Sequence, residues 1–177
     1  MKLSLIIPVM NEEDNIKPLF EEIKKALKDI DYEVIVVDDG SSDKTLENLK
    51  KYKYDRVKIV VLNRNYGQTT AISAGINQSR GEIVALMDGD LQNDPRDIPI
   101  MVQKMQKEGW DVVAGVRARR QDGLVLRKIP SKIANWIIRK STGVYLKDYG
   151  CTLKVFKKKV AKNLGLYGEL HLSLIHI

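Results

Sequence analysis

Cysteine and long apolar runs are what this sequence of 177 residues has least of. Its one cysteine, Cys151, excludes an intramolecular disulfide, so we expect a cytosolic setting in which this side chain is a small buried hydrophobe. No apolar stretch reaches the roughly 20 residues that a membrane-spanning helix needs. The apolar start of the chain is too short for a signal peptide, because it leads directly into Asn11-Glu12-Glu13. We therefore expect a cytosolic or peripheral protein rather than an integral one.

The sequence also lacks internal repeats, low-complexity segments and Gly/Ser linkers. With 44% hydrophobic and 30% charged residues it has the composition of one soluble globular domain, which excludes collagen-like and disordered classes. No Gly-x-Gly-x-x-Gly follows the first apolar run, which argues against a dinucleotide-binding oxidoreductase.

Positive charge is unevenly distributed along the chain. The net charge is +7, but residues 1–100 hold 14 Lys/Arg against 18 Asp/Glu, whereas residues 101–177 hold 16 against 5. This asymmetry indicates either a basic face turned toward phosphates, nucleic acid or an anionic membrane, or simply a solvated basic surface.

Five short apolar runs alternate with segments of helical periodicity, which predicts an α/β fold with a mostly parallel sheet covered on both faces. The strands are expected at residues 3–9, 33–38, 57–62, 82–87 and 111–116. Helices are expected over about 16–27, from Ser42 or Asp43, over Gln68–Gln78 and from Pro95 to near Gly109. Small residues at helical spacing would let the third helix lie close to the sheet. A further basic amphipathic helix, from about Arg127 to Ser141, either packs on its own domain or lies in a membrane interface.

Acidic and amide side chains follow three of these strands, at the carboxyl ends where open parallel sheets bind ligands. The three segments are Pro8-Val9-Met10-Asn11-Glu12, Asp38-Asp39-Gly40-Ser41-Ser42 and Asp88-Gly89-Asp90-Leu91-Gln92. Gly89 would relax the backbone so that Asp88 and Asp90 address one ligand. Mg²⁺ or Mn²⁺ takes one or two carboxylates plus phosphate oxygens and waters, which a nucleotide diphosphate can complete. Acidic turn residues that cap the next helix are the alternative.

This ordered set of motifs, with Arg64-Asn65-Tyr66-Gly67 and Asp148-Tyr149-Gly150-Cys151, resembles family 2 of the glycosyltransferases over residues 1–171. The resemblance implies a GT-A fold, a Rossmann-like three-layer sandwich. More narrowly, the motifs are similar to those of polyprenyl-phosphate sugar transferases, including dolichyl-phosphate mannose synthases and bacterial undecaprenyl-phosphate enzymes. Residues 172–177 can be encoded by a sequencing-library adapter, so we expect a non-native tail and a native chain that continues past His171.

The resemblance also implies roles for the donor-side residues. The predicted donor-binding residues are Pro8, Val9, Asn11, Glu12, Asp39, Gly67 and Asp88. The predicted metal ligands are Asp90, Gln92 and Asp88, of which Asp88 would face the ribose or diphosphate side. Asp38 ranks below Asp39, because it can instead be a turn residue that bonds local backbone. Gly67 either lets a ligand approach the backbone or simply forms a tight strand-to-helix turn.

The acceptor side is expected beyond the fifth strand. Arg117 can pair bidentately with a phosphate, and similar enzymes place this arginine by the sugar donor and acceptor phosphate. Arg127 and Ser131 resemble the residues that take the acceptor lipid's phosphate. Asp148 matches an acidic residue near the acceptor, where it orients groups, binds substrate or is a plain loop residue. The predicted catalytic residues are thus Asp90, Arg117 and Asp148.

The function implied is an inverting, metal-dependent transfer of a sugar from a nucleoside diphosphate to a polyprenyl phosphate. The expected partners are a UDP- or GDP-sugar, the lipid phosphate and the cytoplasmic face of a membrane, with homo-oligomerisation left open and no nucleic acid. Many bacterial members continue into transmembrane segments. One alternative is a transferase acting on a soluble glycan or cell-wall precursor, although the Gln-x-x-Arg-Trp motif of polymer synthases is absent. The other is a non-catalytic nucleotide-sugar-binding module.

Overall fold

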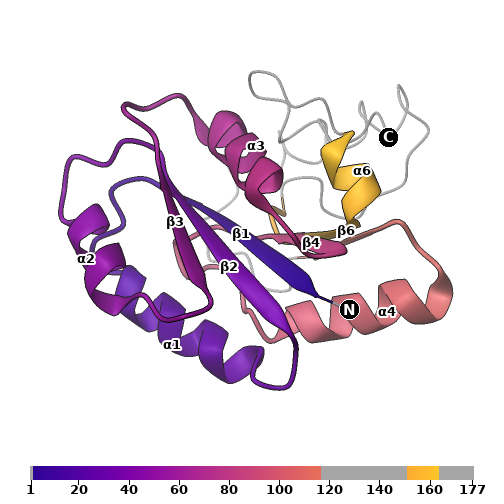
Figure 1. Cartoon of the computed structure of the whole chain (residues 1–177). Helices are drawn as coiled ribbons and strands as arrows, with labels where there is room; N and C mark the ends of the chain where they lie inside the picture. Colours follow the sequence, from indigo (N-terminus) through magenta and orange to yellow (C-terminus); the bar gives the residue numbers. More distant parts are fainter. Residues whose placement is uncertain (1, 117–150, 164–177) are drawn as a thin grey trace, which may run out of the picture.

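The computed structural model describes residues 2–116 and 151–163, which form a sheet with helices on both faces (Figure 1). The strands are β1 (Leu3–Val9), β2 (Tyr32–Asp38), β3 (Val57–Val61), β4 (Ile83–Leu86), β5 (Val112–Ala114) and β6 (Lys154–Lys157). The helices are α1 (Ile16–Ala26), α2 (Thr45–Tyr52), α3 (Gln68–Gln78), α4 (Asp97–Glu108) and α6 (Lys158–Lys162).

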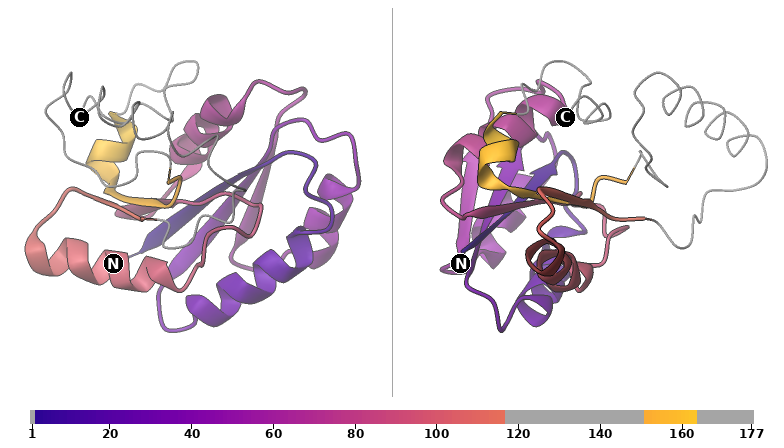
Figure 2. Two further views of the ribbon diagram at one scale, coloured as in Figure 1. Left: turned by 180° about the vertical axis from the view of Figure 1, so that it is seen from behind. Right: turned by 90° about the vertical axis from the view of Figure 1, so that its right-hand side faces the viewer.

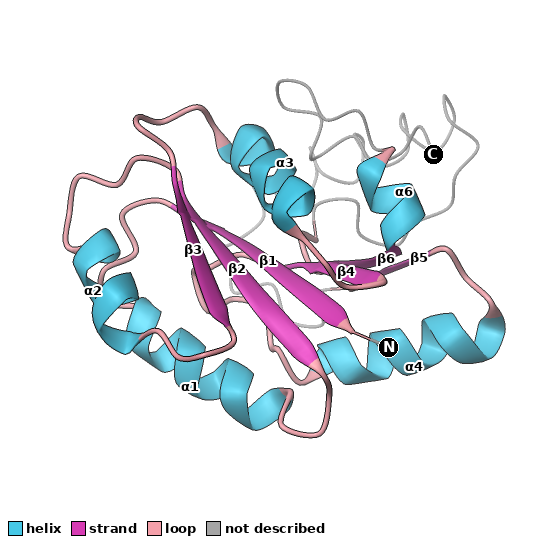
Figure 3. Cartoon of the chain, viewed as in Figure 1, coloured by secondary structure: helices cyan, strands magenta, loops and turns pink. Residues whose placement is uncertain are grey.

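The sheet has the strand order β3-β2-β1-β4-β6-β5 (Figure 3). Strands β1 to β4 pair in parallel, and β6 runs antiparallel between β4 and β5. All five predicted strands are confirmed to within a few residues, and the mostly parallel sheet is as expected. Strand β6 was not predicted, because lysines at both of its ends conceal the two apolar residues between them.

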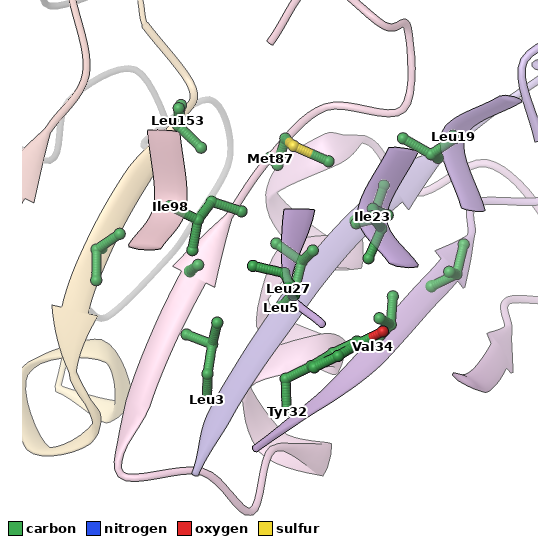
Figure 4. Close-up of a cluster of buried hydrophobic side chains, with 14 of the residues drawn as sticks. Leu3, Leu5, Leu19, Ile23, Leu27, Tyr32, Val34, Met87, Ile98 and Leu153 are labelled. Carbon is green, nitrogen blue, oxygen red and sulfur yellow. The ribbon is translucent and has the colours of Figure 1, made fainter. Parts of the chain in front are cut away.

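Helices lie on both faces of the sheet (Figure 2). An apolar cluster on each face holds these layers together. Alternate side chains of a strand point to opposite faces, so Leu5 and Ile7 pack toward α1 and α4 while Ile6 packs toward α3. Figure 4 shows the first cluster, in which Ile23 of α1 and Leu27, the C-cap residue that follows the helix, lie against the sheet. The predicted α/β three-layer arrangement is therefore confirmed.

Helix α3 lies very close to the sheet, as its small residues predicted. A Cβ atom added to Gly75 would lie 2.4 Å from Ile6 Cγ2, so no larger residue fits there without a shift. Helix α4 ends at Glu108, close to the expected end, and the next residue, Gly109, forms a left-handed C-cap with φ of 76°. The helix begins at Asp97 rather than at Pro95, which lies in the turn before it.

The acidic residues before α1 contact both the start of that helix and the loop that leads into α2. Glu12 Oε2 accepts the side-chain N–H of Asn15, the N-cap residue of α1, at 2.6 Å. Glu13 Oε2 accepts the Lys44 N–H at 2.8 Å, and the Glu12 N–H donates to Thr45 Oγ1 at 2.8 Å. Among the described residues, no helix combines the length and apolarity that crossing a bilayer requires.

Candidate active site

A cleft of about 350 Å³ opens at the carboxyl ends of β1, β2 and β4 and at the N-terminus of α3. It is lined by Pro8, Val9, Met10, Glu12, Asp39, Asn65, Gly67, Gln68, Asp88, Gly89 and Asp90. Seven of these lining residues were predicted to belong to the donor and metal site: Pro8, Val9, Glu12, Asp39, Gly67, Asp88 and Asp90. The convergence follows from the topology, because the carboxyl ends of parallel strands meet at one edge of a sheet.

Asp39 anchors the loop between β3 and α3. Its side chain is buried, and its Oδ1 and Oδ2 accept the backbone N–H groups of Tyr66 and Gly67 at 2.8 and 2.9 Å. Gly67 has φ of 91°, a left-handed conformation that favours glycine, so the strand-to-helix turn is confirmed as one reason for this residue. The space beside its missing side chain is open, because an added Cβ would meet nothing within 4 Å. Approach of a ligand to this backbone stays a prediction.

Asn11 joins the loop after β1 to the loop after β2, and Asp38 makes a hydrogen bond within its own loop. Asn11 has φ of 56°, its N–H donates to Ser41 Oγ at 3.0 Å, and its Oδ1 accepts the Ser42 N–H at 2.9 Å. Asn11 does not line the cleft, although its neighbours do. Asp38 Oδ1 accepts the Ser41 N–H at 3.1 Å, which confirms the turn role that ranked it below Asp39.

Asp88 is held from two sides by uncharged donors. Gln68 Nε2 at the start of α3 donates to its Oδ1 at 2.6 Å, and the Thr152 hydroxyl donates to its Oδ2 at 2.5 Å. Neither Gln68 nor Thr152 was predicted to be functional. Gln68 directly follows the Arg64-Asn65-Tyr66-Gly67 motif and Thr152 directly follows Cys151, but nothing in the sequence alone pairs either with Asp88.

Asp90 is a partly exposed carboxylate of the cleft. Its Oδ1 accepts the N–H of Gln92 at 3.0 Å, and no donor in the described part of the chain is recorded at its Oδ2. Gly89 is not in the left-handed region; instead, an added Cβ would lie 2.6 Å from Val9 Cγ1. Glycine is needed at position 89 because Val9 packs closely against it, and not because the backbone there needs freedom. This corrects the expectation that Gly89 relaxes the backbone. The left-handed residue of this loop is Leu91, with φ of 63°.

These carboxylates lie at the strand ends of a chain whose residues 4–165 match the family model for glycosyl transferase family 2. The chain belongs to this family. The family 2 domain is 48% identical to a dodecaprenyl-phosphate galacturonate synthase of Rhizobium johnstonii, with 97% of the chain and 52% of that relative covered. It is 44% identical to an undecaprenyl-phosphate 4-deoxy-4-formamido-L-arabinose transferase of Pseudomonas fluorescens, with 89% and 47% covered. The chain thus spans about half the length of these relatives.

Solved structures share the fold of the family 2 domain. Residues 1–349 of Staphylococcus aureus TarS match with a TM-score of 0.69 and 22% identity over 99% of this chain and 54% of that one. A mannosyltransferase of Pyrobaculum calidifontis, solved with GDP-Man and Mn²⁺, matches with a TM-score of 0.68 and 23% identity over 94% and 47%. This likeness confirms the predicted GT-A fold.

The residues of the cleft fit a divalent cation only if a ligand supplies further oxygens. No group of three or more His, Cys, Asp or Glu side chains that could hold a metal occurs within residues 2–116 and 151–163. Asp90 Oδ2 has no recorded partner there, whereas both oxygens of Asp88 accept protein donors and Glu12 Oε2 accepts the side-chain N–H of Asn15. One carboxylate, phosphate oxygens and waters form a ligand set that Mg²⁺ prefers. The Gln92 side chain is exposed, and its role as a metal ligand stays a prediction.

The acceptor-side predictions lie outside the described residues. These are Arg117, Arg127, Ser131 and Asp148, together with the basic helix expected over 127–141 and the tail 172–177. Cys151 is described, and it is buried beside Leu153, as its expected role as a small hydrophobe requires.

Proposed function

We propose that this domain transfers a sugar from a nucleoside diphosphate to a polyprenyl phosphate at a membrane surface. The observation that carries the proposal is the difference among the three aspartates of the cleft. Asp39 and Asp88 are anchored by protein donors, while Asp90 keeps one oxygen open toward the cleft. An open carboxylate among rigidly held loops suits a metal-bound diphosphate, and two relatives named for polyprenyl-phosphate sugar transfer support the acceptor class.

The donor would lie across the strand ends. Pro8, Val9 and Glu12 would contact the base and ribose, and the diphosphate would lie near the N-terminus of α3, where the helix dipole favours negative charge. Asp90 would hold Mg²⁺ or Mn²⁺ through its open oxygen, and Gln92 would assist. When bound, the cation would neutralise the negative charge of the departing diphosphate. The Mn²⁺ in the mannosyltransferase structure supports a divalent metal.

The reaction would be a single displacement with inversion. An oxygen of the acceptor phosphate forms a bond to the anomeric carbon while the bond from that carbon to the diphosphate oxygen breaks, and the electron pair leaves with the diphosphate. A phosphate monoester has a second pKa of about 6, so it is mostly ionised at neutral pH and needs no strong general base. Arg117 would pair with both phosphate groups, Arg127 and Ser131 would hold the acceptor, and Asp148 would orient it.

The test uses the full-length protein in membranes, incubated with a panel of labelled UDP- and GDP-sugars. We expect metal-dependent label in polyprenyl-phosphate lipid from one donor. Label in soluble glycans, with none in lipid from any donor, would contradict the proposed acceptor. The variant Asp90→Asn should lose both turnover and metal dependence. Asp94→Asn is the matched control. Asp94 lies only four residues after Asp90, but it does not line the cleft, and it pairs with Arg96 at 2.6 Å.

A further inference from the structure

The hydroxyl of Thr152 joins the two ends of the loop that presents Asp90. Thr152 Oγ1 donates to Asp88 Oδ2 at 2.5 Å and accepts the side-chain N–H of Asn93 at 3.2 Å. Asp88 begins the segment Asp88-Gly89-Asp90-Leu91-Gln92 and Asn93 follows it, so one hydroxyl spans the whole loop. We propose that Thr152 is a positioning residue for the metal and diphosphate site, which fixes the loop in the conformation that turns Asp90 into the cleft.

The chain holds the Thr152 hydroxyl at a fixed place. Its neighbours Cys151 and Leu153 are both buried in the apolar cluster on the face of the sheet that α1 and α4 cover. In addition, Leu153 O accepts the Gly115 N–H at 2.8 Å. In an extended segment successive side chains point in opposite directions, so anchoring these two neighbours directs the residue between them away from the core. The hydroxyl of Thr152 therefore meets Asp88 and Asn93 from a rigid support.

The loop needs such a support because its conformation is costly. Leu91 has φ of 63°, and residues other than glycine are disfavoured in this region. The loop's other recorded restraint at Asp90 is a bond within the loop, from the Gln92 N–H to Asp90 Oδ1. A bond that stays inside the loop does not fix its orientation to the cleft. The hydrogen bonds of Thr152 do so, because they join both loop ends to a different part of the chain.

The hydrogen-bond directions give Thr152 a role that valine cannot replace. A carboxylate only accepts, so the Thr152 proton must go to Asp88, which leaves the hydroxyl lone pairs for the Asn93 amide. Serine can make both bonds, whereas valine keeps the shape and makes neither. A hydrogen bond to a charged group is strong enough that its loss should weaken Mn²⁺ binding roughly tenfold if the loop geometry depends on it.

The inference rests on the proposed donor site, and its test is chosen to be separable from the proposed transfer. Full-length wild-type, Thr152→Val and Thr152→Ser proteins are titrated with MnCl₂ in the presence of UDP and, separately, GDP, and free Mn²⁺ is measured by electron paramagnetic resonance. We expect Thr152→Val to bind Mn²⁺ roughly tenfold more weakly and Thr152→Ser to bind close to wild type. Asn93→Ala, which removes the second bond, should weaken Mn²⁺ binding in the same direction and serves if Thr152→Val does not fold.

Ser79→Ala is the matched control for a lost hydroxyl bond. Ser79 is buried at the far end of α3, and its hydroxyl donates to Ile76 O at 2.7 Å, away from the cleft. It should lower the unfolding midpoint without weakening Mn²⁺ binding. Wild-type Mn²⁺ affinity in Thr152→Val, an equal weakening in Ser79→Ala, or no Mn²⁺ binding by wild type with either nucleotide would each overturn the inference. A protein that binds Mn²⁺ as expected but labels no polyprenyl-phosphate lipid would refute the proposed acceptor and leave the role of Thr152 supported.

Discussion

Replacement of Gly89 by alanine tests the packing that separates Asp88 from Asp90. The added Cβ would lie 2.6 Å from Val9 Cγ1, about 1 Å inside an ordinary carbon contact. Val9 is only 3% exposed and its β-branched side chain has few rotamers, so it cannot turn away freely. Overpacking of this kind costs about 1–3 kcal/mol, and we expect Gly89→Ala to lose that much free energy of unfolding in urea.

Gly75→Ala provides a matched overlap at a place away from the cleft. Its Cβ would lie 2.4 Å from Ile6 Cγ2, on the buried face of α3. Alanine gains up to about 1 kcal/mol over glycine in a helix, so Gly75→Ala should be destabilised by an equal or smaller amount. Only Gly89→Ala should also weaken Mn²⁺–nucleotide binding, because its overlap displaces the backbone between the two carboxylates. Wild-type stability in Gly89→Ala, or equal loss of binding in both variants, would refute this reasoning.

Three further predictions concern the cleft loops and the opposite end of the sheet. Gly67→Ala should cost about 1–3 kcal/mol in urea unfolding through backbone strain alone, since its φ of 91° and ψ of 153° lie in a region that essentially only glycine adopts, and an added Cβ would meet nothing within 4 Å. Asp39→Asn leaves one carbonyl oxygen for two backbone donors, so we expect weaker nucleotide binding and faster amide hydrogen exchange at Tyr66, with a smaller effect at Gly67, whose N–H also donates to Asn65 Oδ1 at 2.8 Å; unchanged exchange at Tyr66 would count against the anchor. Partial burial raises the pKa of Glu33, but hydrogen bonds from Ser4 and the Arg80 amide, with nearby positive charge, outweigh it and hold the pKa below its usual value. Glu33→Gln should therefore be less stable than wild type at pH 7, and this difference should shrink as the pH falls through the folded-state pKa in acid unfolding; a constant difference would contradict the shift.

The sequence was most informative where local pattern decides structure. Strands β1 to β5 are short apolar runs, and α3 was predicted at its observed bounds because its small residues recur at helical spacing. The backbone role of Gly67 was likewise among the predicted alternatives, since glycine at a strand-to-helix turn is a local signal.

What the sequence could not reveal depends on contacts between distant segments. Thr152 reaches Asp88 across 64 positions, and Gln68 reaches it across 20, so no spacing rule links them. The role of Gly89 was misjudged for the same reason, because the atom it must avoid belongs to Val9 on another strand. Strand β6 was missed because locally it is only two apolar residues between lysines, and its pairing with β4 and β5 is what makes it a strand.

The position of β6 has a consequence for synthesis of the protein from its N-terminus. Strand β5 pairs with β6 and not with β4, so a nascent chain that has reached Ala114 still has an unpaired edge on β4. That edge is open to wrong pairing until Lys154–Lys157 has been made and inserted. Thr152 arrives in the same step, only two residues earlier. Completion of the sheet and bracing of the Asp88–Asn93 loop are thus one late event, and a partly made chain should not bind nucleotide and metal before it happens.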